Sequence, residues 1–219
     1  MVKENLIKIF KELPSGVELV AATKQRSVDE IRQALEAGLK IVGENYIQEA
    51  KDKFSILGAK LRWHFIGHLQ KNKIKPAVKI FDMIETLDSV ELAAVLDKEC
   101  KAINKVMPVL IEVNSAHEAQ KSGVLPQDTE ALLKEILRFS NLKPMGLMTM
   151  GPWLDDAQKI RPFFRETKNV FDKVKNNYGS ELEWIYLSMG MSFSYRVAIE
   201  EGANIVRIGT AIFGERTKK

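Results

Sequence analysis

Residues 182–209 read LEWIYLSMGMSFSYRVAIEEGANIVRIG, and this stretch contains the structural unit that recurs along the chain. An apolar run at 182–188 is followed by a polar loop, the helical segment SYRVAIEEG, and a second apolar run at 204–209. The two runs are mostly apolar throughout and do not alternate, which is typical of strands buried on both faces of a parallel sheet. A strand, a helix and a further parallel strand are the elements of an α/β fold.

The same alternation occupies the rest of the sequence. Earlier apolar runs, each followed by a longer amphipathic segment, lie at 18–22, 40–43, 61–67, 82–86, 106–113 and 142–149. No linker or low-complexity stretch interrupts them. We therefore expect one domain over residues 1–219, a closed (β/α)8 TIM barrel, with an open doubly wound sheet as the alternative. The N-terminal segment MVKENLIKIFKEL has helical spacing and predicts an extra helix before the first strand.

The composition is that of an ordinary globular protein. Of the 219 residues, 45% are hydrophobic and 28% charged, and 33 basic against 29 acidic residues give a net charge of +4. This mild excess does not indicate a nucleic-acid partner. No apolar run is long enough for a signal peptide or a membrane span. The single cysteine, Cys100, cannot form an internal disulfide and is expected to be structural, so we expect a cytoplasmic protein without a membrane partner.

Polar residues follow the predicted strands at the end where barrel proteins build their sites. They include Lys24 after the first strand, Asn45 after the second, and Arg207 near the end of the eighth. Loops are polar in general, so this pattern indicates a candidate rim without identifying its chemistry. At the end of an apolar strand, Lys24 could be a nucleophilic amine, although a lysine that simply reaches solvent has the same spacing.

The loops after the seventh and eighth strands carry more information. SMGMS (188–192) supplies hydroxyls and a glycine that lets backbone N–H groups approach an anion, and RIGT (207–210) supplies a cation, a glycine and a hydroxyl. Barrels often bind phosphate with these two loops. We therefore expect a phosphate site here, with Ser192 also acting as the N-cap of the next helix.

The two histidines His64 and His68 are four residues apart, a spacing that on a helix would suggest a metal pair. Here the sequence WHFIG reads as a strand that runs into a loop, so the rings would not share a face. No neighbouring cysteine or carboxylate completes a ligand set. A metal site is not expected.

Several motifs together carry a resemblance to a known family. In chain order they are VAATK, GENYIQEA, WHFIGHLQKNK, GLMTMGP, LSMGMS and VRIGTAIFG. The chain resembles the YggS/PROSC family of pyridoxal phosphate homeostasis proteins from about Leu19 to Gly214. The resemblance implies a barrel like the N-terminal domain of alanine racemase (PLP fold type III), without the C-terminal β-domain.

The resemblance also implies roles for particular residues. Lys24 matches the lysine that binds pyridoxal 5′-phosphate (PLP) as an imine, Arg207 matches the arginine that faces the pyridine nitrogen, and Asn45 lies near the ring. The phosphate would be held by the two loops, at Ser188, Met189, Gly190, Ser192, Gly209 and Thr210.

One loop departs from the family pattern. After the fifth strand the family usually has N-x-G-x-E-x-S/T-K-x-G, whereas residues 114–123 read NSAHEAQKSG. Asn114, Glu118, Lys121 and Gly123 match that pattern, while the early glycine and the hydroxyl before Lys121 are missing. The contacts of this loop are therefore open, and His117 has no assigned role.

The resemblance favours a carrier that buffers PLP or supplies it to PLP-dependent apoenzymes over a PLP-dependent amino-acid racemase. An arginine at the pyridine nitrogen keeps that nitrogen unprotonated and makes the ring a poorer electron sink, but alanine racemase uses the same arrangement, so the arginine does not decide between the two. The sequence ends at Lys219, directly after the eighth unit, so we expect no C-terminal domain that would enclose the site, no robust catalysis and a monomer. Tyr46 could replace a racemase base, but packing is the preferred interpretation. A third alternative, a barrel enzyme that acts on a sugar phosphate, would leave the match to the family motifs unexplained.

Overall fold

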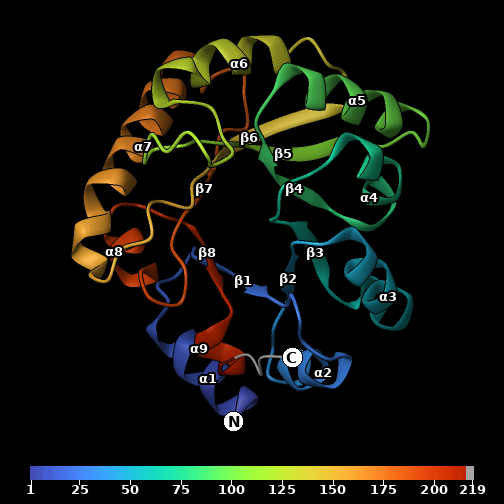
Figure 1. Cartoon of the computed structure of the whole chain (residues 1–219), viewed down its shortest axis with the longest axis vertical. Coiled ribbons are helices and arrows are strands. Elements are labelled where there is room, and N and C mark those ends of the chain that lie inside the picture. Colours follow the sequence, from blue (N-terminus) through green and yellow to red (C-terminus); the bar gives the residue numbers. More distant parts are fainter. Residues whose placement is uncertain (216–219) are drawn as a thin grey trace.

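The structure, a computed structural model, describes residues 1–215 as a closed barrel of parallel strands surrounded by helices (Figure 1). The barrel closes because β1 pairs in parallel with both β2 and β8. The predicted TIM barrel is therefore confirmed, and the open sheet is excluded. The strands are β1 (Glu18–Ala22), β2 (Ile41–Glu44), β3 (Arg62–Phe65), β4 (Met83–Leu87), β5 (Met107–Glu112), β6 (Leu142–Met148), β7 (Tyr186–Ser188) and β8 (Ile205–Ile208).

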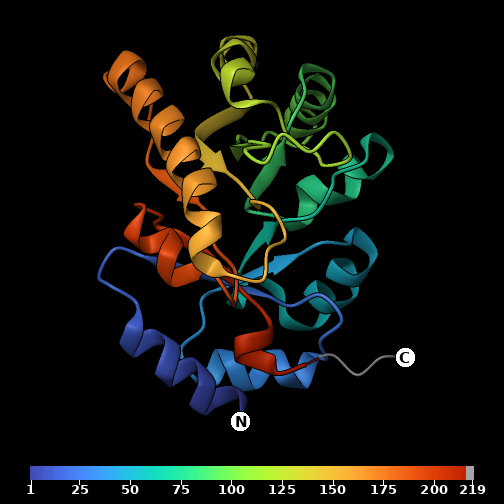
Figure 2. The same cartoon turned by 60° about the vertical axis from the view of Figure 1, so that its left-hand side comes forward.

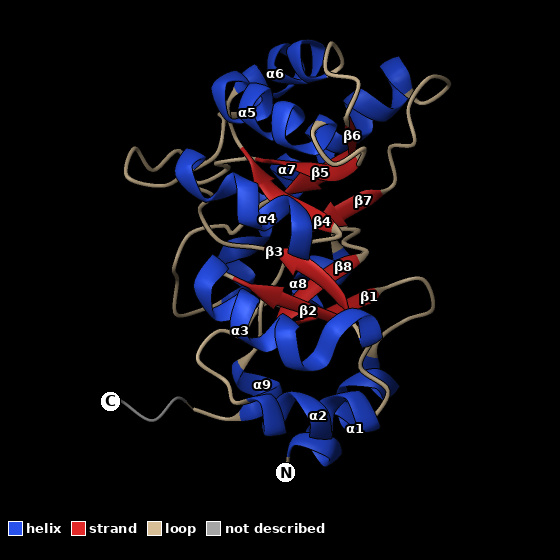
Figure 3. Ribbon diagram, turned by 90° about the vertical axis from the view of Figure 1, so that its right-hand side faces the viewer, coloured by secondary structure: helices blue, strands red, loops and turns tan. Residues whose placement is uncertain are grey.

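The helices form the outer layer around the red strands in Figure 3. They are α1 (Val2–Glu12), α2 (Val28–Glu36), α3 (Ile47–Leu57), α4 (Ile74–Ile80), α5 (Val90–Lys101), α6 (Thr129–Ile136), α7 (Ala157–Tyr178), α8 (Tyr195–Glu200) and α9 (Thr210–Phe213). The predicted extra N-terminal helix is α1. It lies against α2 and α9 at one side of the barrel (Figure 2), where the Asn5 amide donates to the Ile212 carbonyl at 3.0 Å.

Alternate residues of each strand face the barrel interior and the helix layer, because successive side chains of a strand point to opposite sides. The interior is filled by two apolar clusters, one around Val20, Ile41 and Ile205 and one around Leu110 and Met148. The main apolar core lies between the strands and the helices. The inward-facing positions nearest the carboxyl ends of the strands are the ones that can carry a site.

The seventh strand is shorter than predicted, because Trp184 at the start of the apolar run belongs to the helix layer. Its ring stacks on Phe171 of α7 with centroids 5.8 Å apart, and its indole N–H donates to the Phe171 carbonyl at 3.2 Å. Regular pairing with β6 starts only at Tyr186. There Gly146 has φ +153°, and a side chain on it would overlap the Tyr186 carbonyl oxygen. A glycine is therefore needed for this close approach of β6 and β7.

Within residues 1–215, no helix is long and apolar enough to cross a membrane.

Candidate functional site

The two-residue period of the strands determines which side chains reach the site. Stepping by two from inward-facing apolar residues leads to charged or polar residues at the barrel mouth, the opening at the carboxyl ends of the strands. Tyr186 leads to Ser188 and Ile205 leads to Arg207, while Leu110 on β5 leads to Glu112. The same step leads from Met83 to Glu85 on β4, and from Ala22 to Lys24 just beyond β1.

Arg207 is the centre of a buried polar network inside the barrel, with 3% of its surface exposed. Its guanidinium donates to the Ser188 hydroxyl at 2.6 Å and to the Thr149 carbonyl at 2.8 Å. The Ser188 hydroxyl in turn donates to Glu85 Oε2 at 2.7 Å, and Glu85 Oε1 lies 2.7 Å from His64 Nδ1. We call His64, Glu85, Ser188 and Arg207 the Arg207 network.

The charges within this network balance one another. Burial alone raises the pKa of Glu85, but the hydrogen bond and charge of His64, the charge of Arg207 and the Ser188 hydroxyl together hold that pKa below its usual value. Burial lowers the pKa of Arg207 despite the neighbouring carboxylates of Glu85 and Glu112. Glu85 thus remains an anion beside Arg207.

The turn that carries Lys24 is held from both sides by α3. The buried Lys53 ammonium donates to the Thr23 carbonyl at 2.6 Å and to Glu44 Oε1 at 2.7 Å. On the other side of Lys24, the Gln25 N–H donates to Glu49 Oε1 at 2.5 Å. Because residues on both sides of Lys24 are anchored, the turn keeps its side chain at the mouth.

The buried carboxyl of Glu44 completes this anchor. The Thr23 hydroxyl donates to its Oε1 at 2.7 Å, beside the Lys53 bond. Burial nevertheless raises the pKa of Glu44, more than Lys53 and Thr23 lower it.

Asn45, the residue after β2, is the clearest sign of an incomplete site. Its side-chain oxygen Oδ1 is buried and has no hydrogen-bond partner among the described residues. The backbone of Asn45 packs directly on Gly67 after β3, where any side chain would overlap it. A buried acceptor without a donor costs free energy, so this oxygen can accept a hydrogen bond from a donor that enters the site.

The loops after β7 and β8 are joined by Ser192. Its hydroxyl accepts hydrogen bonds from the Gly209 and Ala211 N–H groups, each at 3.2 Å. The prediction that Ser192 caps the next helix is wrong: α8 begins at Tyr195 with Ser194 at the N-cap position. The serine hydroxyl is occupied at the start of α9 instead, since the first N–H groups of a helix lack partners within it.

The structure divides the residues expected to bind the cofactor into two groups. Lys24, Asn45, Ser192, Gly209 and Thr210 are accessible from solvent to differing extents. The second group is buried beneath them and contains Ser188, Met189, Gly190 and Arg207.

Two members of the buried group have other partners. The Ser188 hydroxyl is used within the Arg207 network, and the Met189 side chain packs in the apolar core between barrel and helices. Gly190 has φ +88°, and a Cβ there would lie 2.6 Å from that of Ala198, so the turn requires glycine.

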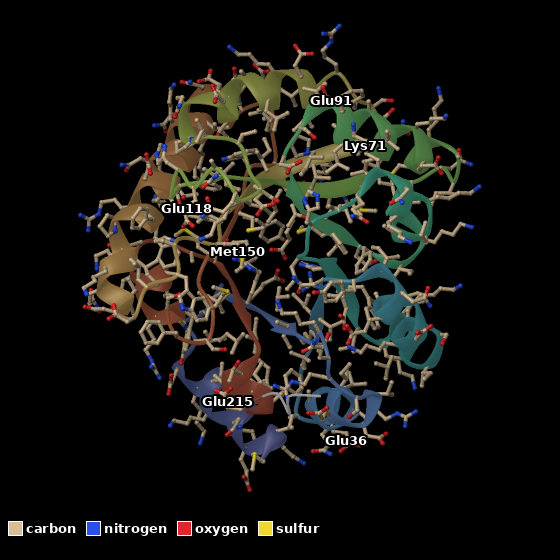
Figure 4. The ribbon with its side chains drawn as sticks, viewed as in Figure 1. Glu36, Lys71, Glu91, Glu118, Met150 and Glu215 are labelled. Carbon is tan, nitrogen blue, oxygen red and sulfur yellow. The ribbon has the colours of Figure 1, made fainter. Side chains whose placement is uncertain are left out.

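A cavity of about 290 Å³ opens beside these residues, between the loops that follow β5, β6 and β7. None of the residues expected to bind the cofactor lines it. Its walls include Glu112, Ser115, Lys121, Thr149, Met150, Trp153 and Met191. Figure 4 shows Met150 inside the ring of strands, with Glu118 on a neighbouring loop. Because Arg207 contacts both Thr149 and Met150, the cavity adjoins the Arg207 network.

The loop with the altered motif is closed by its own residues. The Asn114 amide donates to the Glu118 carbonyl at 2.8 Å, and the Lys121 ammonium donates to Glu118 Oε1 at 2.6 Å. Lys121 also donates to the Gly151 carbonyl at 3.1 Å. His117 points to Glu166 on α7, 3.3 Å away, and takes no part in the cavity.

The structure also places the other side chains singled out from the sequence. His64 is bonded to Glu85 and His68 to Ser122, so the two rings do not converge. Cys100 is fully buried on α5, and burial raises the pKa of its thiol to about 11, which makes it unreactive. The packing role of Tyr46 is wrong, since this residue is 59% exposed at the start of α3.

Sequence reasoning assigned no role to Glu85, Glu112 or Lys53. The first two could have been recognised by counting forward in steps of two from the inward-facing residues of β4 and β5. For Lys53 the sequence carried no comparable signal, because its partners Thr23 and Glu44 lie on two other elements.

Comparisons with known proteins identify relatives along almost the whole chain. Residues 1–217 match the family described as the N-terminal domain of alanine racemase. The pyridoxal phosphate homeostasis protein of Aquifex aeolicus is 42% identical over 200 residues, covering 91% of this chain and 87% of that protein. The mouse protein of the same name is 36% identical and covers 98% of this chain and 83% of its own length.

Solved structures agree with this result. PipY from Synechococcus elongatus, with PLP bound, superposes with a TM-score of 0.90 at 31% identity and covers 98% of this chain and all 100% of its own. An alanine racemase from Clostridium difficile has a TM-score of 0.81 at 14% identity, and the match covers 100% of this chain but 60% of the racemase. The racemase therefore shares the barrel, and that likeness establishes the fold alone.

Proposed function

Since this chain belongs to the YggS/PROSC family of pyridoxal phosphate homeostasis proteins, we propose that it binds PLP at the barrel mouth and holds it for other enzymes. The observation that carries the proposal is that Lys24, Ser192, Gly209 and Thr210 lie at the carboxyl ends of β1, β7 and β8 and are reachable from solvent. These three strands are neighbours in the barrel, with β8 paired to both β1 and β7.

The residues present fit PLP at this place. Ser192, Gly209 and Thr210 form the phosphate end, where hydroxyls and backbone N–H groups meet the start of α9. Ser188, Met189 and Gly190 support this end from below. Lys24 is the residue that bonds to the aldehyde carbon. Asn45, whose buried Oδ1 has no donor among the described residues, accepts a hydrogen bond from the ligand.

Arg207 is proposed to face the ring nitrogen from below. Bound PLP supplies an electrophilic aldehyde and a ring that can accept electrons. Arg207 cannot accept a hydrogen bond, and its own donors are held by Ser188 and Thr149. A ring nitrogen beside it would stay unprotonated, which would reduce the electron-accepting power of the ring.

Delivery to apoenzymes is the proposed use of the carrier. The mouth is surrounded by large exposed side chains: Trp153 on the loop after β6 is 90% exposed, and Phe193 after β7 and Tyr46 after β2 are each 59% exposed. Exposed aromatic residues around an opening are suited to transient protein contacts. We propose that the carrier is a monomer of one domain, which leaves the mouth open for exchange, and that it works in the cytoplasm.

The first test is a visible absorbance spectrum of the protein loaded with PLP. We expect a yellow protein whose band disappears on borohydride reduction, and a band that is absent or strongly altered in Lys24→Ala. The matched control is Lys71→Ala, which removes an exposed lysine from the loop after β3 and should leave the spectrum unchanged. A wild-type protein that takes up no PLP would refute the proposal.

A further inference from the structure

The Glu112 carboxyl is a buried charged group without a partner. Glu112 ends β5, faces the barrel interior and is 8% exposed, yet it makes no side-chain hydrogen bond or ion pair within residues 1–215. The exposed part of its surface lines the cavity of about 290 Å³. Buried carboxyl groups in proteins are normally bonded, so a bare one that faces a cavity indicates a missing donor.

The charged groups around Glu112 do not supply that donor. Arg207 on β8 is engaged by Ser188 and Thr149, and it lies 4.0 Å from Glu85 on β4. Lys121, from the loop after β5, is engaged by Glu118 and Gly151.

A further charged neighbour is Asp88 after β4, which has the same sign as Glu112. Burial and Asp88 raise the pKa of Glu112 to about 7, although Arg207 acts against them. The cavity therefore combines a carboxyl group that no cation bonds within the described residues with enough volume to hold one.

We propose that this cavity is a binding site for a small ammonium ion, a ligand of amino-acid size, whose N–H groups donate to the Glu112 carboxylate. The ammonium supplies both the missing hydrogen bonds and the missing positive charge. The apolar side chains of Met150 and Met191 and the indole of Trp153 line the rest of the cavity, and an aromatic face attracts a cation. In a protein loaded with PLP, the ligand would lie beside an aldehyde that reacts with amines, and that consequence alone rests on the proposed function.

The experiment uses trimethylammonium as the probe, because a tertiary amine keeps an N–H donor when protonated and cannot form an imine with PLP. Binding is followed by NMR, from the indole N–H resonance of Trp153 and the methyl signal of the probe, in full-length protein with and without PLP. The neutral molecule tert-butanol, similar in shape, serves as the control ligand.

We expect trimethylammonium to bind in both forms of the protein and tert-butanol to bind at least about tenfold more weakly. Glu112→Gln should weaken trimethylammonium binding by about tenfold or more, because the amide keeps the shape and loses the charge. Glu36→Gln makes the same change on an exposed carboxylate of α2 that does not line the cavity, and it should leave binding within about twofold.

A pH series provides a second readout. Affinity should rise between about pH 6 and about pH 8 as Glu112 ionises, and this rise should be absent in Glu112→Gln. The inference is overturned if trimethylammonium does not bind, if tert-butanol binds equally well, or if both variants bind like the wild type. Because PLP uptake is measured separately by absorbance, the amine site can fail while the proposed function stands.

Discussion

Arg207 and Glu112 are charged residues of opposite sign that face the same barrel interior, from β8 and β5, and both are more than nine-tenths buried. Arg207 has an acceptor for each of its terminal nitrogens, and its acceptors have further partners in turn. Glu112 has no bonded side-chain partner among the described residues. The chain itself supplies bonds to the first residue and none to the second, so burial alone does not tell the two situations apart.

The largest expected effect concerns Arg207, the residue whose side chain has bonded partners. Arg207→Met should lower the free energy of unfolding by about 3–5 kcal/mol, because the buried Glu85 would lose the charge of Arg207 and keep only its bonds to His64 and Ser188. Urea denaturation followed by circular dichroism measures this. Arg165→Met is the control, since Arg165 bonds Glu201 at the protein surface and should matter far less. Equal losses in the two variants would remove the contrast between a structural and a surface charge.

For Glu112, which has no bonded partner, the expected change in the free energy of unfolding has the opposite sign. The pKa of Glu112 is raised from 4.5 to about 7 in the folded protein, so folding keeps a proton that the unfolded chain releases. The stability from this group is present below about pH 4.5 and is lost as pH rises through about 7, a difference of about 3 kcal/mol because one pKa unit is worth about 1.4 kcal/mol.

Glu112→Gln should therefore be more stable than the wild type at about pH 8, by up to about 3 kcal/mol, and the gain should shrink toward about pH 5. Urea denaturation at the two pH values checks this. A variant that is destabilised at the higher pH would mean that Glu112 has a partner in the folded protein.

The smallest expected effect separates two serines of one loop. Ser188→Ala should lower the free energy of unfolding by about 1–2 kcal/mol and change PLP affinity little, because its hydroxyl is used by Glu85 and Arg207. Ser192→Ala should weaken PLP binding and cost less stability, because the Gly209 and Ala211 N–H groups that lose their acceptor are only partly buried and can bond water. Fluorescence titration with PLP and urea denaturation measure the two quantities. If both variants lost the same amount of stability and of PLP affinity, the two hydroxyls would have the same role.

Local sequence patterns were sufficient for the barrel. Apolar runs and amphipathic segments follow each other eight times, and each unit is stabilised by packing against its neighbours along the chain. Local patterns failed at Trp184, which lies in an apolar run of the sequence but packs in the helix layer and not in β7. They also failed at Ser192, because Ser194 is the residue at the N-cap position of α8. In both cases the deciding partner lies on another element.

By itself, the sequence determined the barrel, the family, and the placement of Lys24 and the two loops at one rim, because these follow from periodicity and from motifs that are continuous along the chain. Only the tertiary structure decided which polar residues are paired. Closure of the barrel brings Glu85 within reach of Ser188 and Arg207 across more than a hundred residues of sequence, and it leaves Glu112 and Asn45 Oδ1 without donors in the described chain. Hydrogen bonds act over a few ångströms in space, so spacing along the sequence does not record them.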